Sequence, residues 1–356
     1  MGRRTSTSPT ALSSMITQAV PLLKEAERLT PRQGRGDKPA YPDWWMALLI
    51  MIAVLHKKRS KSAQYRFLCG RQQELLAVWG GERFPARSGY FRRYHRAAVL
   101  YQTAVRLQGE LALAEGVADA KQVAVDKSLL SARGPVWHQR DRQKGKIPAG
   151  VDVAGTWSYS EYDGWVFGFS YEVVVTATPG SLVFPLLATV ATASASEMST
   201  FVSKIHDLPA AVRTVCADSA YDGNLLGELI EYDEQDRRTG RRFLCPENPR
   251  NKNRPKTKPC NADASRALSR KRRHERKEFL HKPHGRRLYA RRRKTVEPFN
   301  QWFKSLFELE DRVWHRGLEN NQTQLLASLF CYQLLIRLNH QLGMRHGQIR
   351  WLLDRL

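Results

Sequence analysis

Three acidic residues constrain the fold of this chain most, because each has a sequence context that suits a shared pocket. Asp126 follows the apolar run 123–125 and Asp218 follows the apolar run 215–217, so each is expected at the tip of a buried strand. Glu297 lies far downstream, in a segment that has the character of a helix start. Two strand ends and one helix can bring three carboxylates together, which favours an α/β fold.

Three carboxylates in one pocket suit a site for two divalent cations. Two Mg²⁺ ions about 3.5 to 4 Å apart take hard oxygen ligands, and such a pair activates an attacking oxygen while it stabilises a leaving one. Nucleic acid is the obvious substrate for that chemistry. Taken singly, each acid also has an ordinary structural interpretation, as a helix N-cap or as a polar residue at a strand end.

Three longer segments surround these acids. Residues 124–128 are Ala-Val-Asp-Lys-Ser, residues 215–223 are Val-Cys-Ala-Asp-Ser-Ala-Tyr-Asp-Gly, and residues 293–304 run from an arginine to a lysine. In this combination the chain resembles the DDE transposases of bacterial insertion sequences, whose catalytic core has a ribonuclease-H-like fold. The resemblance extends over residues 41–342, since residues 85–93 are similar to the helical domain of that family.

The closing signature of the family is a Tyr, Arg, Glu and Lys at fixed spacing. Arg293, Glu297 and Lys304 fit the last two spacings, whereas Tyr289 is one residue too far from Arg293. The resemblance implies that Arg293 and Lys304 hold phosphates near the cut, because a guanidinium or an ammonium pairs well with phosphate oxygens. It leaves the role of Tyr289 open.

The resemblance implies a transposase that cuts phosphodiester bonds at the ends of its element and joins the freed 3′-hydroxyls to target DNA. Asp126, Asp218 and Glu297 would then bind two Mg²⁺ ions, with Mn²⁺ as an alternative metal. The expected partner is double-stranded DNA, both element ends and target, and a homodimer on DNA is compatible with this role. Two other functions stay open: a non-catalytic DNA-binding derivative of the fold, and a ribonuclease-H-like nuclease that cuts without joining.

The charge of the chain also favours a polyanionic partner. The net charge is +24 and the sequence pI is about 10.2. Residues 237–294 hold 23 Lys or Arg against four acids, a balance of +19. A basic surface between the second and third acids would hold the DNA backbone beside the chemistry, and a solvated charge run or flexible linker is the alternative. The predicted DNA contacts in this segment are Arg270, Lys271, Arg272 and Arg273.

The cysteines and the apolar runs indicate a cytoplasmic, nucleoid-associated protein without a membrane partner. Five cysteines are scattered and lack a CxxC pair, so disulfides are not expected. Residues 1–36 lack the apolar core of a secretory signal, and the apolar run 44–55 is too short to span a bilayer and suits a buried helix. The wide spacing disfavours a zinc site built from Cys245, Cys260, His274, His281 and His284.

The order of expected elements fits a ribonuclease-H-like mixed sheet flanked by helices, although the pattern alone allows other α/β folds. The expected elements are a strand at 122–126, a hairpin of 165–178 and 182–192, a helix at 196–208, a strand at 213–217, a helix at 224–232, a strand at 242–245 and a final helix. The chain is predicted to divide into a flexible N-terminus (1–40), a helical domain that binds DNA ends (41–116), a catalytic core (117–312) and C-terminal helices (313–356). The N-terminal segment is expected to contain a short helix at 22–29, and the helical domain a long amphipathic stretch at 90–111. The alternative for 41–116 is a packing domain with solvated arginines.

Two local predictions concern residues near the acids. Asp222 is interpreted as the N-cap of the apolar helix that follows Gly223, and it is therefore left out of the catalytic set. Thr295 as an N-cap would place Pro298 in the first helical turn, where its missing N–H costs little. Trp302 on that helix is expected to pack inside rather than to stack a displaced base.

Overall fold

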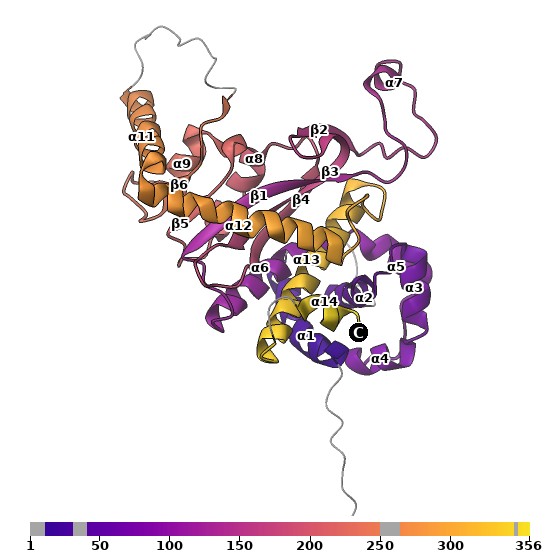
Figure 1. Ribbon diagram of the computed structural model, residues 1–356. Coiled ribbons are helices and arrows are strands. Elements are labelled where there is room, and N and C mark those ends of the chain that lie inside the picture. The colour runs from indigo at the N-terminus through magenta and orange to yellow at the C-terminus, as the bar shows by residue number, and fades with distance from the viewer. Residues whose placement is uncertain (1–10, 31–40, 250–263, 345–347) are drawn as a thin grey trace, which may run out of the picture. The chain divides into compact units, whose positions relative to one another are not determined.

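The computed structural model describes residues 11–30, 41–249, 264–344 and 348–356 (Figure 1). The chain divides into two compact units, which are described separately. The helical unit comprises residues up to 108, residues 133–153 and residues from 305 onwards. The sheet unit comprises residues 109–132 and 154–304. The catalytic core was predicted at 117–312, whereas the sheet unit begins at 109, ends at 304 and leaves residues 133–153 to the helical unit.

The sheet unit is built on a mixed six-stranded sheet with the order β2-β3-β1-β5-β6, in which β4 also pairs with β3. The pairs β1–β3, β2–β3 and β3–β4 are antiparallel, whereas β1–β5 and β5–β6 are parallel. This arrangement confirms the predicted mixed sheet, and β2 is an additional strand that the sequence did not predict. The strands are β1 (Gln122–Ser131), β2 (Thr156–Ser160), β3 (Gly164–Thr176), β4 (Pro185–Thr192), β5 (Thr214–Cys216) and β6 (Arg242–Leu244).

The first strand is longer than predicted. Asp126 was expected at the tip of a strand, but β1 continues to Ser131, and Asp126 pairs with Val173 in the interior of the β1–β3 ladder. The reason is that two ladders of different length share this strand. The parallel pairing with β5 stops at Ala124, while the antiparallel pairing with β3 goes on to Ser131. The Asp126 side chain therefore lies beyond the end of the parallel ladder without lying at the end of the strand.

One long helix of the sheet unit differs from its predicted form. The prediction that Thr295 is an N-cap is wrong, because α12 runs from Pro283 to Leu306 with Pro298 inside it, so Arg293 and Tyr289 also lie within the helix. Pro298 has no N–H to donate to the Lys294 carbonyl one turn earlier, and the helix continues through it nonetheless. The Thr295 hydroxyl donates a hydrogen bond to the Arg291 carbonyl (2.9 Å) in the turn before. The helices of this unit are α8 (Glu197–Val202), η1 (Ile205–Asp207), η2 (Ser219–Tyr221), α9 (Asn224–Glu231), α11 (Ala264–His281) and α12 (Pro283–Leu306).

Two almost fully buried helices form the centre of the helical unit. Every residue of α2 after Asp43 is buried, as predicted for this apolar run, and residues 323–339 of α13 are buried as well. The helices of this unit are α1 (Ala11–Leu29), α2 (Asp43–Leu55), α3 (Lys61–Cys69), α4 (Gln72–Trp79), α5 (Arg87–Tyr94), α6 (Ala97–Ala114), α7 (Gln139–Gln143), α13 (Leu318–Gln341) and α14 (Ile349–Leu353). Helix α2 packs against α1, α3, α5 and α13, and α13 also packs against α1 and α14, so neighbouring helices cover both.

The structure differs from the predicted divisions at both ends of the chain. Residues 11–29 form α1 rather than part of a flexible segment, because an apolar side chain recurs every three or four residues and packs against α2 and α13. The predicted long stretch at 90–111 is divided between α5 and α6. The helices at 313–356 belong to one unit with the N-terminal helices. Among the described helices, none combines the length and the apolar character needed to cross a membrane. The buried face of α1 comprises Leu12, Met15, Ile16, Ala19, Leu22, Leu23 and Ala26.

Candidate active site around Arg292

The structure brings the three predicted acids together on the sheet unit. β1 and β5 are parallel neighbours whose last paired residues are Ala124 and Cys216. Asp126 and Asp218 each follow two residues after that pair, so the two carboxylates leave the sheet at the same level. Glu297 approaches them from α12, which lies across the sheet (Figure 1). Adjacent strands and a crossing helix thus supply one carboxylate each.

Arg292 lies between the three carboxylates, and the sequence did not single it out. Its Nη2 is 2.5 Å from Asp126 Oδ1 and 3.6 Å from Asp218 Oδ2, and its Nη1 is 3.4 Å from Glu297 Oε1. Arg292 is buried, and its Nε has no hydrogen-bond partner among the described residues. One guanidinium therefore faces three carboxylates. We call these four residues the acid cluster.

Asn300 and Tyr171 orient the Asp126 carboxylate and were also missed. Asn300 Nδ2 donates to Asp126 Oδ2 at 2.9 Å, while the Tyr171 hydroxyl donates to Asn300 Oδ1 at 3.0 Å. The tyrosine bond fixes which end of the amide faces Asp126, because a hydroxyl donor must meet the amide oxygen. Both oxygens of Asp126 are therefore held, one by Arg292 and one by Asn300. The available sequence signal was weak: Asn300 lies one helical turn after Glu297.

The electrostatics of the acid cluster favour a cation. Burial raises the pKa of the Asp126 carboxyl to about 7, against the lowering effect of Arg292, and the charges of Asp218 and Glu297 raise this pKa further. Burial likewise raises the pKa of Asp218, opposed by Arg292 and by the backbone N–H of Ala220, which donates to Asp218 Oδ1 at 2.9 Å. Burial lowers the pKa of Arg292, but the Asp126 and Asp218 carboxylates have the larger combined effect, so the pKa of Arg292 is raised. Negative charge exceeds positive charge here.

The donor set of the acid cluster fits a hard divalent cation in its chemistry. Asp126, Asp218 and Glu297 offer carboxylate oxygens, the ligands that Mg²⁺ and Mn²⁺ prefer. In the arrangement described, however, Arg292 spans the three acids, and among the described residues no group of three or more acidic, histidine or cysteine side chains is arranged to hold a metal ion. A metal at this place therefore requires the guanidinium to withdraw.

The residues of the closing signature have different environments. Lys304 donates from Nζ to the Leu129 carbonyl at 3.0 Å, and burial lowers the pKa of its ammonium while the charges of Asp163 and Asp126 oppose that shift. Arg293 is exposed on α12, where a phosphate can reach it. Tyr289 is partly covered, and burial raises its pKa to about 12. Lys304 thus has an intramolecular partner, and Arg293 is the more accessible cation.

The predicted DNA contacts on α11 divide into two pairs. Arg270 and Lys271 are exposed. Arg272 Nη1 lies 2.6 Å from Glu228 Oε2, and Arg273 Nη2 lies 2.5 Å from Asp222 Oδ2, so both are engaged in ion pairs within the sheet unit. The alternative of a flexible linker is wrong for residues 264–294, which are helical apart from a bend at Lys282; residues 250–263 lie outside the described part.

The interpretation of Asp222 as an N-cap is wrong. Gly223 occupies the N-cap position of α9, and the Asp222 carboxylate turns to α11 instead, where Arg273 and Lys277 contact it. It also accepts a hydrogen bond from the backbone N–H of Asn248 at 2.8 Å. The two cations of α11 explain the difference, because the side-chain hydrogen bond and the charge of Arg273 together hold the pKa of Asp222 below its usual range despite burial. Asp222 remains outside the acid cluster.

A second buried charge cluster lies in the same unit and consists of Glu172, Lys204, Tyr221, Thr200 and Thr189. Lys204 Nζ lies 2.5 Å from Glu172 Oε1 and also donates to Thr189 Oγ1 at 2.9 Å. Tyr221 and Thr200 donate to Glu172 Oε2 at 2.8 and 2.6 Å. We call this set the Glu172 cluster. Through Tyr221, which closes the short helix η2, it anchors the turn that carries Asp218.

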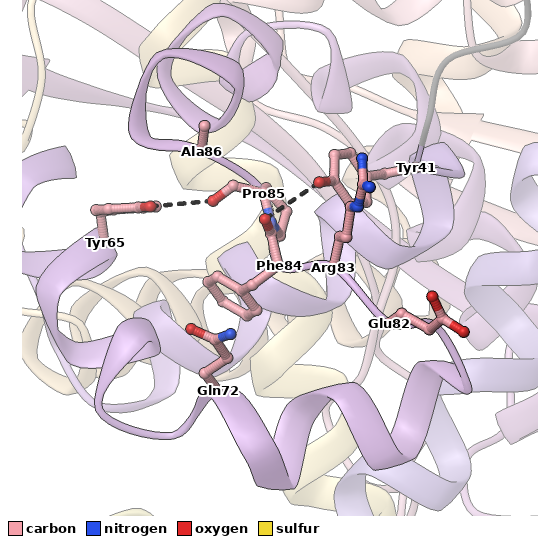
Figure 2. A pocket seen from close by; sticks show the side chains of 8 residues that line it. All are labelled: Tyr41, Tyr65, Gln72, Glu82, Arg83, Phe84, Pro85 and Ala86. Atoms are coloured by element: carbon pink, nitrogen blue, oxygen red, sulfur yellow. Dashed lines mark hydrogen bonds between the residues drawn. The ribbon is translucent and has the colours of Figure 1, made fainter.

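Other candidate sites carry less chemistry. The zinc alternative includes Cys260, which lies outside the described residues, and the described cysteines are all free thiols. A cavity of about 380 Å³ lies in the helical unit between α3, α4 and the segment 82–86, where Tyr41 and Tyr65 donate to backbone carbonyls (Figure 2). None of the predicted site residues lines it.

Comparison with known proteins agrees with this geometry. The family model described as "Transposase DDE domain" matches residues 117–334, well over half of the chain. The chain therefore belongs to the DDE transposase family, and its mixed sheet flanked by helices is the ribonuclease-H-like fold of that class. A search of curated proteins finds no match. Membership implies a transposase that binds DNA, and transposases of this family generally use divalent metals.

Proposed function

We propose that this protein cuts phosphodiester bonds at the ends of a mobile element, such as a bacterial insertion sequence, and joins the freed 3′-hydroxyls to target DNA at the acid cluster. The observation that carries the proposal is the convergence of Asp126, Asp218 and Glu297, from two strands and a helix, on one cationic group. Because these acids share a single arginine, they leave negative charge that a divalent cation can neutralise. Mg²⁺ is the proposed metal and Mn²⁺ its substitute.

When bound, the metal ions would supply activation of the attacking oxygen and stabilisation of the leaving one. The residues of the chain have distinct parts in this proposal. Asp126, Asp218 and Glu297 hold the ions, and Asn300 keeps the Asp126 carboxylate oriented toward them through the bond to Tyr171. Arg292 offsets part of the negative charge of the acids, and its guanidinium would be available to a phosphate oxygen if a bound cation took its place. Arg293, exposed on the same helix, contacts the DNA backbone.

The decisive experiment measures cleavage and strand transfer on labelled end DNA with Mg²⁺, beside a gel-shift on the same DNA. Asp126→Asn, Asp218→Asn and Glu297→Gln are each expected to lower both activities by about 10³-fold or more, because each removes a charge that holds the metal. End binding should stay largely intact. Asp222→Asn is the control, since Asp222 contacts α11 and not the acid cluster. Normal cleavage by Asp126→Asn, or an inactive Asp222→Asn beside an active Asp218→Asn, would show that the ligands are misassigned.

The same assay separates the alternatives. A nuclease that does not join would cleave the ends without producing strand-transfer products, and a non-catalytic derivative would shift the DNA without cutting it. Short inverted repeats on either side of the reading frame would further support transposition. DNA-bound protein can also be sized by sedimentation, which tests the proposed homodimer.

Two of the α11 cations are exposed and two are held in ion pairs, and we expect the two pairs to contribute differently to DNA binding. Replacing Arg270 and Lys271 with Gln should weaken duplex binding and flatten the slope of log K against log salt by about 0.9 for each phosphate that the protein no longer neutralises. The matched variant replaces Arg272 and Arg273 with Gln; it should leave the slope nearly unchanged and lower the melting temperature, because these two residues hold Glu228 and Asp222. Equal salt slopes for the two variants would contradict this assignment.

A further inference from the structure

The hairpin of β2 and β3 carries four aromatic side chains on one face of the sheet. Trp157 pairs with Phe167 and Tyr159 pairs with Trp165, and paired residues of antiparallel strands point to the same side. The ring centroids are 5.5 Å apart in the first pair and 5.6 Å apart in the second, and Trp157 lies 6.4 Å from Trp165. We call these four residues the aromatic face.

Much of the aromatic face is in contact with water. Trp165 is 69% exposed and Tyr159 is 54% exposed. Cross-strand aromatic pairs stabilise a hairpin modestly, yet that role does not call for two large rings of high exposure at its outer end. Exposed aromatic residues that gather on one surface usually mark a place where a ligand binds. Tyr162, at the turn between the two strands, is 96% exposed and adds a fifth ring nearby.

The aromatic face belongs to the same side of the sheet as the acid cluster. Along β3 every second residue from Trp165 to Val173 points to one side, and Val173 is the partner of Asp126. Between them Tyr171 contacts α12, through Asn300 and the ring of Phe303 at 5.2 Å. Eight residues of strand separate Trp165 from Val173, which is at most about 26 Å.

Charged residues near the aromatic face lie in the hairpin turn and on α12. The charge of Asp163 in the turn acts on Lys304 of α12, and the charge of Asp126 acts on the same ammonium. The helix α12 carries seven Lys or Arg and a single acid; six of the cations lie at 286–294, before Glu297, and Lys304 lies after it. An anionic strand is therefore favoured where it passes α12, whereas Glu161 and Asp163 flank Tyr162 in the hairpin turn.

We propose that the aromatic face stacks unpaired bases of a DNA strand whose backbone follows α12. This rests on the proposed function, which places DNA at the acid cluster. Planar exposed rings beside a basic helix suit a ligand with apolar planes and a phosphate backbone, and unpaired nucleotides have both. A duplex presents only edges and backbone, because its base planes are stacked on each other. The separation along β3 corresponds to at most about eight nucleotides from the acid cluster, because an unpaired strand can extend further per nucleotide than a duplex.

The test uses duplex end DNA that has a single-stranded extension containing 2-aminopurine, without metal, so that no cleavage occurs. Stacking on the aromatic face should quench the fluorescence, and Trp165→Ala combined with Tyr159→Ala should abolish the quenching and weaken binding of the extended DNA by about tenfold to a hundredfold. Binding of the blunt duplex should be unchanged. Trp165→Phe keeps a ring and should retain most of the quenching, which separates loss of stacking from loss of fold.

Trp351→Ala, which removes a 46% exposed tryptophan of α14, is the matched control and should behave as wild type. Equal quenching and affinity for wild type and the double variant would overturn the proposal. The proposal would also be overturned if the double variant lost self-association in sedimentation but still quenched the 2-aminopurine fluorescence, because the aromatic face would then bind a second copy of the chain. Cleavage assays on the same proteins distinguish the two proposals. If the wild-type protein quenches the fluorescence but does not cleave DNA, only the proposed function is contradicted. If it cleaves DNA but does not quench the fluorescence, only the stacking proposal is contradicted.

Discussion

The sheet unit contains two charge clusters of opposite character, each built around a buried cation. In the Glu172 cluster one carboxylate meets one ammonium, and two hydroxyls donate to the second carboxylate oxygen. In the acid cluster three carboxylates share the guanidinium of Arg292. The first cluster has matched charges and satisfied hydrogen bonds. The second has more negative than positive charge and an Nε without a partner among the described residues.

This difference indicates which cluster supports the fold and which supports chemistry. Buried charges are tolerated when they are paired and hydrogen-bonded, as Glu172 and Lys204 are. In the acid cluster the carboxylates outnumber the cation, and only Asp126 is largely buried with Arg292, since the side chains of Asp218 and Glu297 are 39% and 52% exposed. Such an imbalance around a buried arginine is characteristic of sites where a ligand compensates for the charge. The raised pKa of Asp126, caused first by its burial, is the clearest sign of that imbalance.

The largest expected effect on stability comes from breaking the matched cluster. Glu172→Gln leaves Lys204 buried without a counter-charge and should lower the free energy of unfolding by about 3–5 kcal/mol. Asp126→Asn should leave stability unchanged or raise it, because burial disfavours the charged carboxylate and Arg292 retains Asp218 and Glu297. Thermal unfolding of both variants checks the contrast.

Two controls accompany that measurement. Glu172→Gln combined with Lys204→Met removes both charges and should recover most of the loss. Asp233→Asn disrupts the exposed pair with Arg237 and should leave the melting temperature unchanged. A larger loss for Asp126→Asn than for Glu172→Gln would reverse the roles given to the two clusters.

A smaller effect concerns His315, a buried neutral group in the helical unit. Burial, with Lys61 and Arg133 adding to it, lowers the pKa of His315 to about 3. The unfolded chain, with a pKa near 6.5, therefore binds the proton first, so stability is full above about pH 6.5 and is lost as the pH falls toward the folded pKa. The loss at about pH 5 should be about 2 kcal/mol.

The measurement is the difference in melting temperature between neutral pH and about pH 5, for wild type and His315→Gln. The variant lacks the titrating ring and should show a flatter pH dependence. Identical pH profiles would mean that folding does not shift the pKa of His315.

The smallest expected effect tests whether Arg292 competes with the metal. Arg292→Gln removes the cation that contacts all three acids, so Mn²⁺ binding in the absence of DNA should tighten by about tenfold, or about 1.4 kcal/mol. Arg293→Gln is the matched control on the exposed side of the same helix. Weaker Mn²⁺ binding by Arg292→Gln would mean that the guanidinium supports the ligands instead of competing for them.

Much of the fold could be predicted because local pattern decided it. The hairpin of β3 and β4 follows from β-branched runs separated by Pro179-Gly180-Ser181, and α2 follows from an uninterrupted apolar run. The length of β1 could not be predicted, because residues 127–131 join the sheet only through their pairing with β3. The start of α12 was also missed, since Pro298 favoured a helix that begins at Thr295, whereas α12 begins at Pro283 and its basic first half contacts the sheet through Arg292.

The acids of the site could be predicted, whereas their partners could not. Asp126, Asp218 and Glu297 each follow a recognisable local pattern, and their convergence follows from the parallel pairing of β1 with β5. Arg292 is one of four consecutive basic residues, and only the helical phase of α12 distinguishes the buried arginine from exposed Arg293. Side chains that act on each other across distant segments leave little trace in a single sequence.

The central claim is that Asp126, Asp218 and Glu297 hold the metal ions. It is tested most directly by counting Mn²⁺ ions bound per chain in complexes with end DNA, for wild type, Asp126→Asn and Glu172→Gln. The account predicts two ions for wild type, two for Glu172→Gln wherever it remains folded, and fewer for Asp126→Asn. Two ions per chain in Asp126→Asn would contradict it.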